Sequence, residues 1–242
     1  MKTAFNISKK CLLVILDGFG INQADLKNAI KHAKKPYLDQ LFKNYPFTTI
    51  EAGGEKVGLP KGVCGNSEVG HMNLGAGRPI RQDLVQINEK IVDKTLAEMI
   101  ELKNLISHAK SNGNRIHLIG LLSDGGVHSD IKHIKEIISI LSKENIELFF
   151  HAFMDGRDTA PNIGMKYITD LKSVPGFNFA SMQGRSVGMD RDRRWEKIQS
   201  AYETFIGLAE ITDLTPEQWI EQEYKKEIYD EFISPVLFNK DF

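Results

Sequence analysis

The sequence predicts an α/β protein built around a parallel β-sheet. Three apolar segments of strand length, residues 115–122, 146–153 and 177–183, alternate with segments whose apolar residues recur every three or four positions. Strands that alternate with helices in this way form βαβ units, whose strands are parallel. A continuous apolar run at residues 11–16 is also typical of a buried parallel strand.

Composition and charge exclude several classes of protein. Hydrophobic residues make up 41% and charged residues 26% of the 242 residues, which is typical of one or two globular domains. A net charge of -1 gives no reason to expect nucleic acid or an anionic membrane as a partner. No apolar run approaches the ~20 residues of a membrane span, and the N-terminus lacks the apolar region of a signal peptide. Cys11 and Cys64 form no disulfide framework, so we expect a cytoplasmic protein.

The first elements along the chain are a strand, a helix and a second strand. The run at 11–16 is followed at once by Asp17, which places this carboxylate at the carboxyl end of the expected strand. Pro36 is expected to open a helix and Pro46 to end it. Residues 47–52 are expected to form a second strand before a Gly-Gly pair.

Helices are expected between and around the three later strands. Residues 82–109 have a helical pattern, and a second helix should follow the strand at 115–122, with Ser129 or Asp130 as its N-cap. A third helix should start at Pro161. A fourth carries its apolar residues at spacings of three and four, namely Trp195, Ile198, Tyr202 and Phe205.

Ser67 lies between glycines, with helix-forming residues directly after it. A hydroxyl at a helix N-terminus faces free N–H groups and the positive end of the helix dipole, which suits a phosphoryl group. The spacing G-x-S-x-x-G is one residue too long for the nucleophile elbow of α/β-hydrolases, which disfavours acyl transfer. Two alternatives stay open here: Ser67 is only an N-cap, with Glu68 in the first turn, or Cys64 is the nucleophile.

Polar segments follow each of the three later strands. They are residues 123–128, residues 155–158 and residues 184–185 with 190–194 downstream. Because the carboxyl ends of parallel strands meet at one edge of a sheet, these segments should gather where such folds bind ligands. A histidine, several arginines and several carboxylates at that edge predict a pocket for a small anionic molecule.

Two other interpretations of these polar residues remain open. The run 190–194 alone is typical of a solvated helix start. The pairs Asp124 with His128 and Asp130 with His133 have spacings that metal ligands can adopt. No further histidine or cysteine with ligand spacing supports a metal site there, so we rank substrate binding above it.

At these residues the sequence resembles the cofactor-independent (2,3-bisphosphoglycerate-independent) phosphoglycerate mutases of the alkaline phosphatase superfamily. Five motifs carry the likeness: VILDGFG at 14–20, GNSEVGH at 65–71, SDGGVHS at 123–129, HAFMDGRD at 151–158 and MDRDRRW at 189–195. Residues 230–235 are also similar to the family. Five long motifs in order make the resemblance specific, and it extends from about Cys11 to Pro235.

The resemblance implies the interconversion of 3-phosphoglycerate and 2-phosphoglycerate through a phosphoserine on Ser67. It implies two divalent metal ions, which we expect to be manganese, with Asp17 and Ser67 among their ligands, and no need for 2,3-bisphosphoglycerate. Substrate-binding residues are expected in the second segment. They are His128, Arg157, Asp158, Arg185 and Arg191.

The family's layout implies a phosphatase-like domain that is split in sequence by an inserted α/β transferase domain. Residues 1–80 would be the first piece of the phosphatase-like domain and carry the nucleophile, and residues 81–242 would be the substrate-binding domain. No Asp-His dipeptide occurs in this sequence, although the family's metal site normally contains one. We therefore expect both domains to be incomplete, the chain to be about the first half of such an enzyme, and the isolated chain to have little mutase activity.

Two other functions remain in view. One is a metal-dependent phosphatase or sulfatase of the same superfamily, which would release the group to water. The other is a non-catalytic phosphoglycerate-binding fragment. In either case we expect a small-molecule ligand, no nucleic acid or membrane partner, and a monomer in the full-length form.

Overall fold

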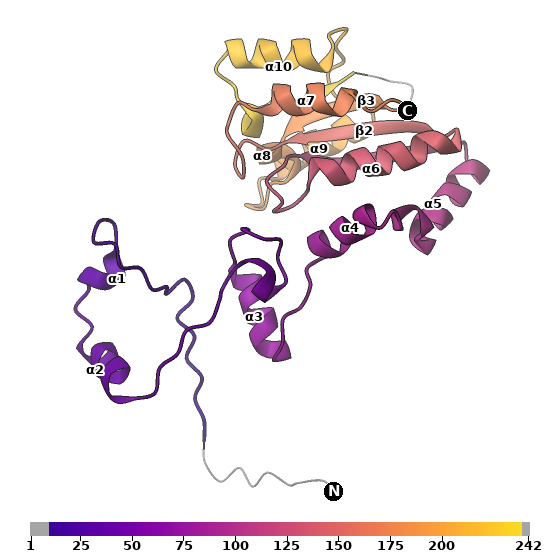
Figure 1. Ribbon diagram of the computed structural model, residues 1–242. Helices are drawn as coiled ribbons and strands as arrows, with labels where there is room; N and C mark the ends of the chain where they lie inside the picture. Colours follow the sequence, from indigo (N-terminus) through magenta and orange to yellow (C-terminus); the bar gives the residue numbers. More distant parts are fainter. Residues whose placement is uncertain (1–9, 239–242) are drawn as a thin grey trace, which may run out of the picture. The chain divides into compact units, whose positions relative to one another are not determined.

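The computed structural model describes residues 10–238, and the chain divides into two compact units, Met1–Gln82 and Asp83–Phe242 (Figure 1). This division lies two residues beyond the domain boundary expected at 80/81. Residues 1–9, on which the expected lack of a signal peptide depends, lie outside the described range. The predicted α/β class is confirmed, because the second unit contains a four-stranded sheet with helices around it.

The sheet has the strand order β1-β2-β3-β4. β1 (Arg115–Leu122), β2 (Glu147–Met154) and β3 (Asn178–Gly184) pair in parallel, as predicted. β4 (Val236–Leu237) pairs with β3 in the antiparallel direction. Two residues carry no periodic signal, so the sequence could not predict β4.

The three parallel strands end level with one another. Leu122 pairs with Met154, and Met154 pairs with Gly184, at the carboxyl ends of the strands. Each residue that follows, at positions 123, 155 and 185, therefore leaves the sheet at the same edge. The register itself places the three polar loops together.

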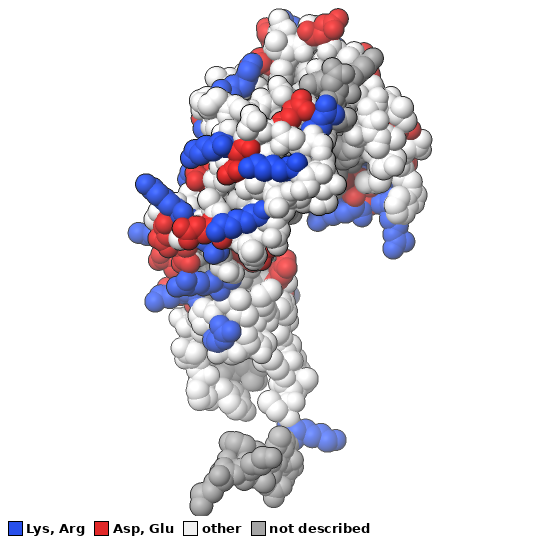
Figure 2. Space-filling model, turned by 90° about the vertical axis from the view of Figure 1, so that its right-hand side faces the viewer, with Lys and Arg blue, Asp and Glu red and all other residues white. Residues whose placement is uncertain are grey.

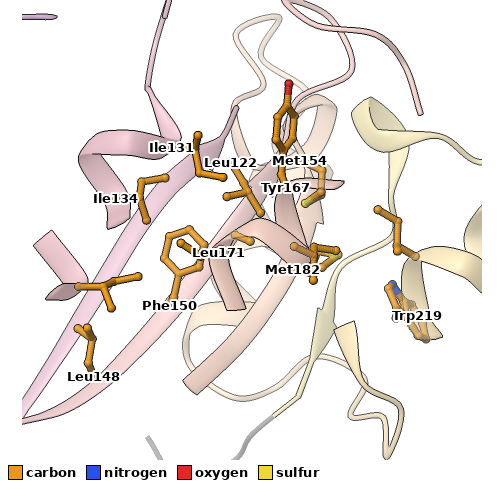
Figure 3. Close-up of a cluster of buried hydrophobic side chains, with 14 of the residues drawn as sticks. Leu122, Ile131, Ile134, Leu148, Phe150, Met154, Tyr167, Leu171, Met182 and Trp219 are labelled. Atoms are coloured by element: carbon orange, nitrogen blue, oxygen red, sulfur yellow. The ribbon is translucent and has the colours of Figure 1, made fainter. Parts of the chain in front are cut away.

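Three helices cover one face of the sheet and enclose the main core. They are α6 (Ile131–Leu141), α7 (Gly164–Lys172) and α10 (Pro216–Lys225). Figure 3 shows side chains from these helices and from the strands in this core, which includes the fully buried Phe150. The ring of Tyr167 lies in this cluster, and its hydroxyl points away from it.

On the other face of the sheet, α9 (Trp195–Phe205) packs against β2 and β3. This helix begins at the predicted residue. The Phe205 ring contacts His151, with 5.3 Å between ring centroids. His151 Nδ1 lies 2.8 Å from Ser181 Oγ, and its Nε2 lies 3.0 Å from His117 Nδ1. Burial, and secondarily the neighbouring His117, lowers the pKa of His151 to about 4. His151 is thus a neutral packing residue inside the sheet, although it belongs to the HAFMDGRD motif.

The helix boundaries correct some of the predictions. Asp130, and not Ser129, caps α6, since its carboxylate accepts from the Lys132 amide at 2.9 Å. The helix expected at Pro161 begins only at Gly164, because the carboxylate of Asp230 accepts the first amides of α7.

The helix expected over residues 82–109 is broken into pieces. These are α4 (Asp83–Val92), a 3-10 helix (Leu96–Glu98) and α5 (Ile100–Ser111). Lys94 adopts a φ of 58°, in the left-handed region, which an α-helix cannot continue through.

The predicted strands of the first unit are wrong. Residues 11–16 and 47–52 are not strands, and the side chains of 11–16 are exposed, Leu12 by 85%. A parallel strand is stable only with neighbours that supply hydrogen bonds and cover both faces, and the described part of this unit provides none. The predicted helix at Pro36 is confirmed as α2 (Pro36–Asn44), which follows the short α1 (Ala29–His32).

A small folded region surrounds the Ser67 motif. It contains a 3-10 helix (Gly54–Val57) and α3 (Ser67–Ala76), joined by an apolar cluster of Val57, Leu59 and Val69. Asn73 of α3 donates to the Val57 carbonyl at 2.9 Å and accepts from the Ile80 amide at 2.9 Å. These bonds tie α3 to the segments on both sides of it.

The surface carries charges of both signs. On the face drawn in Figure 2, Lys and Arg side chains are interspersed with Asp and Glu, in keeping with the net charge of -1. Among residues 10–238, no helix has the length and apolar character that crossing a membrane requires.

We expect Phe150→Ala to lower the free energy of unfolding of the second unit by about 3–5 kcal/mol, because it leaves a cavity in the main core. Ile119→Ala is the matched control: Ile119 lies on β1, is 52% exposed, and should cost less than about 1 kcal/mol. Urea unfolding followed by circular dichroism measures both. Equal losses for the two variants would contradict the assigned core.

Candidate functional site

The first residues after the three parallel strands form one hydrogen-bonded network. Asp155 Oδ2 accepts from Ser123 Oγ at 2.5 Å, and Asp155 Oδ1 accepts from Arg185 Nη1 at 2.6 Å. The same Oδ1 accepts from the amides of Arg157 and Asp158 at 3.2 and 3.0 Å. Asp155 is 1% exposed, so this carboxylate is the buried centre of the network.

Arg185 is held by carboxylates on one side only. Its Nη1 donates to both Asp155 Oδ1 and Asp158 Oδ2, each at 2.6 Å, and its side chain is 10% exposed. Within residues 10–238, neither Nε nor Nη2 of Arg185 has a hydrogen-bond partner. The guanidinium is therefore fixed in direction while two of its nitrogens stay available for an anion.

Each charge in this pair stabilises the other. Burial raises the pKa of Asp155, but the bonds from Ser123, from two backbone amides and from Arg185 together hold it below its ordinary value. Burial lowers the pKa of Arg185, and its bonds to Asp158 and Asp155 outweigh that effect and raise it. Both groups are therefore ionised at neutral pH.

His128 and Arg157 lie at the border of the network. His128 Nε2 is 3.8 Å from Asp158 Oδ2, and Arg157 Nη1 is 3.9 Å from Glu231 Oε1. The Arg157 side chain is 55% exposed, so its guanidinium can turn towards an incoming anion. His128, Arg157, Asp158 and Arg185, which come from the segments after the three parallel strands, thus all lie around this network.

A segment far along the chain packs against two of these loops. The Gly184 amide donates to the Ile233 carbonyl at 2.8 Å, and a Cβ at Gly184 would lie 2.3 Å from the Glu231 carbonyl oxygen. A Cβ at Gly156 would lie 2.7 Å from the Glu231 amide nitrogen. Both glycines are needed for this close approach of backbones.

Asp230 anchors that segment to the start of α7. Its Oδ2 accepts from the amides of Ile163 and Gly164 at 3.1 and 2.8 Å, and Oδ1 accepts from the Tyr224 hydroxyl. Burial raises the pKa of Asp230 to about 6, although the hydrogen bonds from Tyr224 and from the two amides oppose this shift. A carboxylate of the chain thus lies at the N-terminus of α7, where the free amides and the helix dipole favour a negative charge.

The pairs considered as metal ligands are engaged elsewhere. Asp124 accepts a hydrogen bond from the Tyr167 hydroxyl at 2.5 Å, and burial, together with this bond, raises the pKa of Tyr167 to about 12. His133 Nε2 lies 2.7 Å from Asn88 Oδ1. No group of three or more His, Cys, Asp or Glu side chains that could hold a metal ion is found within residues 10–238.

Arg191 is exposed on a turn that Asp190 organises. The Asp190 carboxylate accepts from the amides of Asp192 and Arg194 at 3.1 and 3.0 Å and from the Arg194 side chain at 2.5 Å. Arg193 in the same turn adopts a φ of 61°. Within residues 10–238 the Arg191 side chain forms no hydrogen bond or ion pair, so the structure does not join Arg191 to the Asp155 network.

Ser67 is the first residue of α3, and its side chain is exposed. Asn66 caps the helix, because its side chain accepts from the Val69 amide at 3.0 Å, so the interpretation of Ser67 as the N-cap is wrong. Ser67 Oγ lies 3.2 Å from His71 Nδ1. The amides of Ser67 and Glu68 donate to no acceptor within the described residues, so the helix terminus can receive an anion.

Asp17 lies in an exposed turn, in which the Phe19 amide donates to the Leu16 carbonyl at 3.1 Å. Gly18 adopts a φ of 75° there, which glycine does without strain. In the described part of the chain, the Asp17 carboxylate forms no hydrogen bond or ion pair, with Ser67 or with any other residue.

Three residues of the network were not among the predicted site residues: Ser123, Asp155 and Glu231. Ser123 comes directly after the predicted strand at 115–122, and Asp155 is the first residue of the predicted polar segment 155–158, so their positions in the sequence could have identified them. Glu231 could not be found in this way, because it reaches the site through contacts with distant loops.

Comparison with known proteins identifies the family. Residues 87–242 match the family model of the BPG-independent PGAM N-terminus, where PGAM denotes phosphoglycerate mutase. The chain belongs to this family. Residues 9–164 also match the Metalloenzyme superfamily, which supports a dependence of the family on divalent metal.

Relatives of this family are similar over nearly the whole chain. The 2,3-bisphosphoglycerate-independent phosphoglycerate mutase of Onion yellows phytoplasma is 47% identical over 230 residues, which are 94% of this chain and 45% of the relative. The same enzyme of Clostridium novyi is 44% identical over 239 residues, 96% of this chain and 47% of the relative. The chain thus spans about half the length of these relatives.

A solved structure is similar as well. The phosphoglycerate mutase of Leishmania mexicana, determined at low cobalt concentration, is 31% identical, with a TM-score of 0.76. The match covers 92% of this chain and 43% of that chain.

We expect Asp230 to make stability depend on pH between about 4 and 6. Its pKa is about 6 in the folded protein and about 3.9 when unfolded. In that window the folded state keeps a proton that the unfolded state has lost, so the free energy of unfolding falls as pH rises and levels off above pH 6.

Urea unfolding of the wild type and of Asp230→Asn at several pH values measures this effect. The wild type should lose on the order of 2 kcal/mol more than the variant across the window, because an asparagine does not ionise. Parallel pH profiles for the two proteins would contradict the assignment.

Proposed function

We propose that this chain provides the substrate-binding loops and the nucleophile of a 2,3-bisphosphoglycerate-independent phosphoglycerate mutase. The reaction interconverts 3-phosphoglycerate and 2-phosphoglycerate, a step of glycolysis. Family membership and the names of the relatives support this proposal. The observation that carries it on the chain itself is Arg185, whose guanidinium is fixed by two carboxylates with Nε and Nη2 left available.

The loops of the second unit would hold the glycerate. Arg185 can make a bidentate contact with a carboxylate or phosphate through Nε and Nη2, and the exposed Arg157 can add a second charged contact. His128 and Asp158 offer a donor and an acceptor for the substrate hydroxyls. Such contacts would keep the alcohol bound and oriented while it is without its phosphate.

Ser67 would carry the phosphate in between. In the first step a bond forms between Ser67 Oγ and the phosphorus atom, the bond from phosphorus to the substrate oxygen breaks, and the serine proton passes to that oxygen. In the second step the other hydroxyl oxygen of the glycerate forms a bond to phosphorus, the bond from Ser67 Oγ to phosphorus breaks, and the hydroxyl proton passes to Ser67 Oγ. The exposed hydroxyl and the open amides at the start of α3 suit the charge of the transferring group.

Two divalent ions, which we propose to be manganese, belong to this function as cofactors. Asp17 and Ser67 would supply one oxygen ligand each, which is fewer than a manganese ion takes in its usual octahedral site. The described residues alone therefore do not fit a complete metal centre. We also propose that the protein works in the cytoplasm, needs no 2,3-bisphosphoglycerate, and is a monomer in its full-length form.

A phosphatase or sulfatase of the superfamily is the second candidate activity. The binding of the substrate alcohol distinguishes the mutase from the phosphatase or sulfatase, since an enzyme that releases phosphate to water has no need to retain the alcohol. The arginine and carboxylate network after the three strands therefore favours the mutase. A non-catalytic phosphoglycerate-binding chain would use the same network without Ser67.

We expect the purified chain to bind 3-phosphoglycerate without metal, as measured by isothermal titration calorimetry. Arg185→Lys should weaken this binding about tenfold or more, because a lysine keeps the charge but loses the planar two-pronged contact.

The matched control is Arg115→Ala. Arg115 lies at the opposite end of β1, where it pairs with Glu147 at 2.6 Å, and its loss should leave the affinity unchanged within about twofold. Absence of binding by a folded wild type, or equal effects of the two substitutions, would count against the proposed function.

A further inference from the structure

The buried carboxylate of Asp155 has more partners than any other group in the site. It accepts one bond from the loop after β1, one from Arg185 after β3, and two from amides of its own loop. Asp155 is itself 1% exposed, so it does not face a ligand. Asp155 must therefore influence a ligand through the groups to which it is hydrogen-bonded.

The geometry points to Asp155 as the positioning residue that aims Arg185 at an anionic ligand, with Ser123 as its support. This inference rests on the proposed function for the identity of the ligand, a phosphoglycerate. It assigns a role to two residues that do not touch the substrate.

The direction of the Arg185 guanidinium follows from the way in which it is held. Both carboxylates bind the same nitrogen, Nη1, at 2.6 Å, so the opposite side of the planar group, with Nε and Nη2, is turned away from them. An arginine side chain without these contacts would sample several rotamers. Ordering it on binding would cost entropy and so lower its affinity for the ligand.

Ser123 fixes the orientation of the carboxylate in turn. Its hydroxyl donates to Asp155 Oδ2 at 2.5 Å and accepts from the Gly125 amide at 3.0 Å. With Oδ2 occupied by Ser123, Oδ1 is left to Arg185 and to the amides of its own loop. The chain of contacts from β1 to β3 therefore sets the direction of one guanidinium.

Asp155→Asn tests this role with little change in shape. The amide oxygen can replace Oδ1, and the amide nitrogen can donate to Ser123 Oγ, while the charge that holds Arg185 is lost. We expect about tenfold weaker binding of 3-phosphoglycerate in calorimetry. Ser123→Ala keeps the charge and should weaken binding about threefold, which provides a second variant if Asp155→Asn does not fold.

A double-mutant cycle separates positioning from general stability. If Asp155 acts through Arg185, then Asp155→Asn should change the affinity less than about twofold in a background that already carries Arg185→Met. Asp213→Asn, an exposed carboxylate of the same unit, is the control and should change nothing. Fully additive effects of Asp155→Asn and Arg185→Met would overturn the inference.

A second readout does not depend on the ligand. The Nε–H signal of Arg185 in NMR spectra, assigned by its absence in Arg185→Met, should show an ordered side chain in the wild type and a mobile one in Asp155→Asn. An equally ordered signal in both proteins would overturn the inference even if the chain binds no phosphoglycerate. Failure of the wild type to bind 3-phosphoglycerate, with the loss of order still observed, would instead contradict the proposed function alone.

Discussion

The site depends on the level ending of three parallel strands. Because β1, β2 and β3 pair so that Leu122, Met154 and Gly184 lie side by side, the next residue of each strand enters the same small volume. A shift of the register by one residue would turn these side chains to the other face of the sheet. The hydrogen bonds that Ser123 and Arg185 donate to Asp155 then join the segments after the three strands into one network.

Charge balance explains how this network can be buried and ionised while some donors of Arg185 stay available. An isolated buried carboxylate would be costly, but the guanidinium and the N–H donors around Asp155 compensate for its burial. The carboxylates neutralise much of the charge of Arg185 without covering all of its donors. The available nitrogens are thus held in place by the protein before any ligand arrives, which lowers the entropy lost on binding.

The sequence was sufficient to predict those elements whose apolar pattern lies within the element itself. The strands 115–122 and 178–184 and the helix at 195–205 carry their own apolar periodicity, and the loops after the strands follow from them. The sequence failed where structure depends on distant partners. The run at 11–16 is apolar enough for a buried strand, but an apolar run forms a strand only where neighbouring strands bind to it, and none does within the described residues.

The same limit applies to the site. Arg157 and Arg185 could be predicted to lie near one another because each follows a predicted strand, whereas Arg191 is not joined to the network. The role of Asp155 becomes visible only when the register places it beside Ser123 and Arg185. Asp230 shows this dependence on distant residues even more clearly. It lies 66 residues beyond Gly164, and its bonds to the first amides of α7 fix the start of that helix three residues after Pro161.

The central claim is that the loops after the three parallel strands hold a phosphoglycerate. NMR mapping of backbone amides during titration with 3-phosphoglycerate tests it most directly. We expect the largest shifts on the amides of residues 123–128, 155–158 and 184–186. Shifts centred on α10 or on the opposite end of the sheet, or no shifts at all in a folded chain, would contradict it.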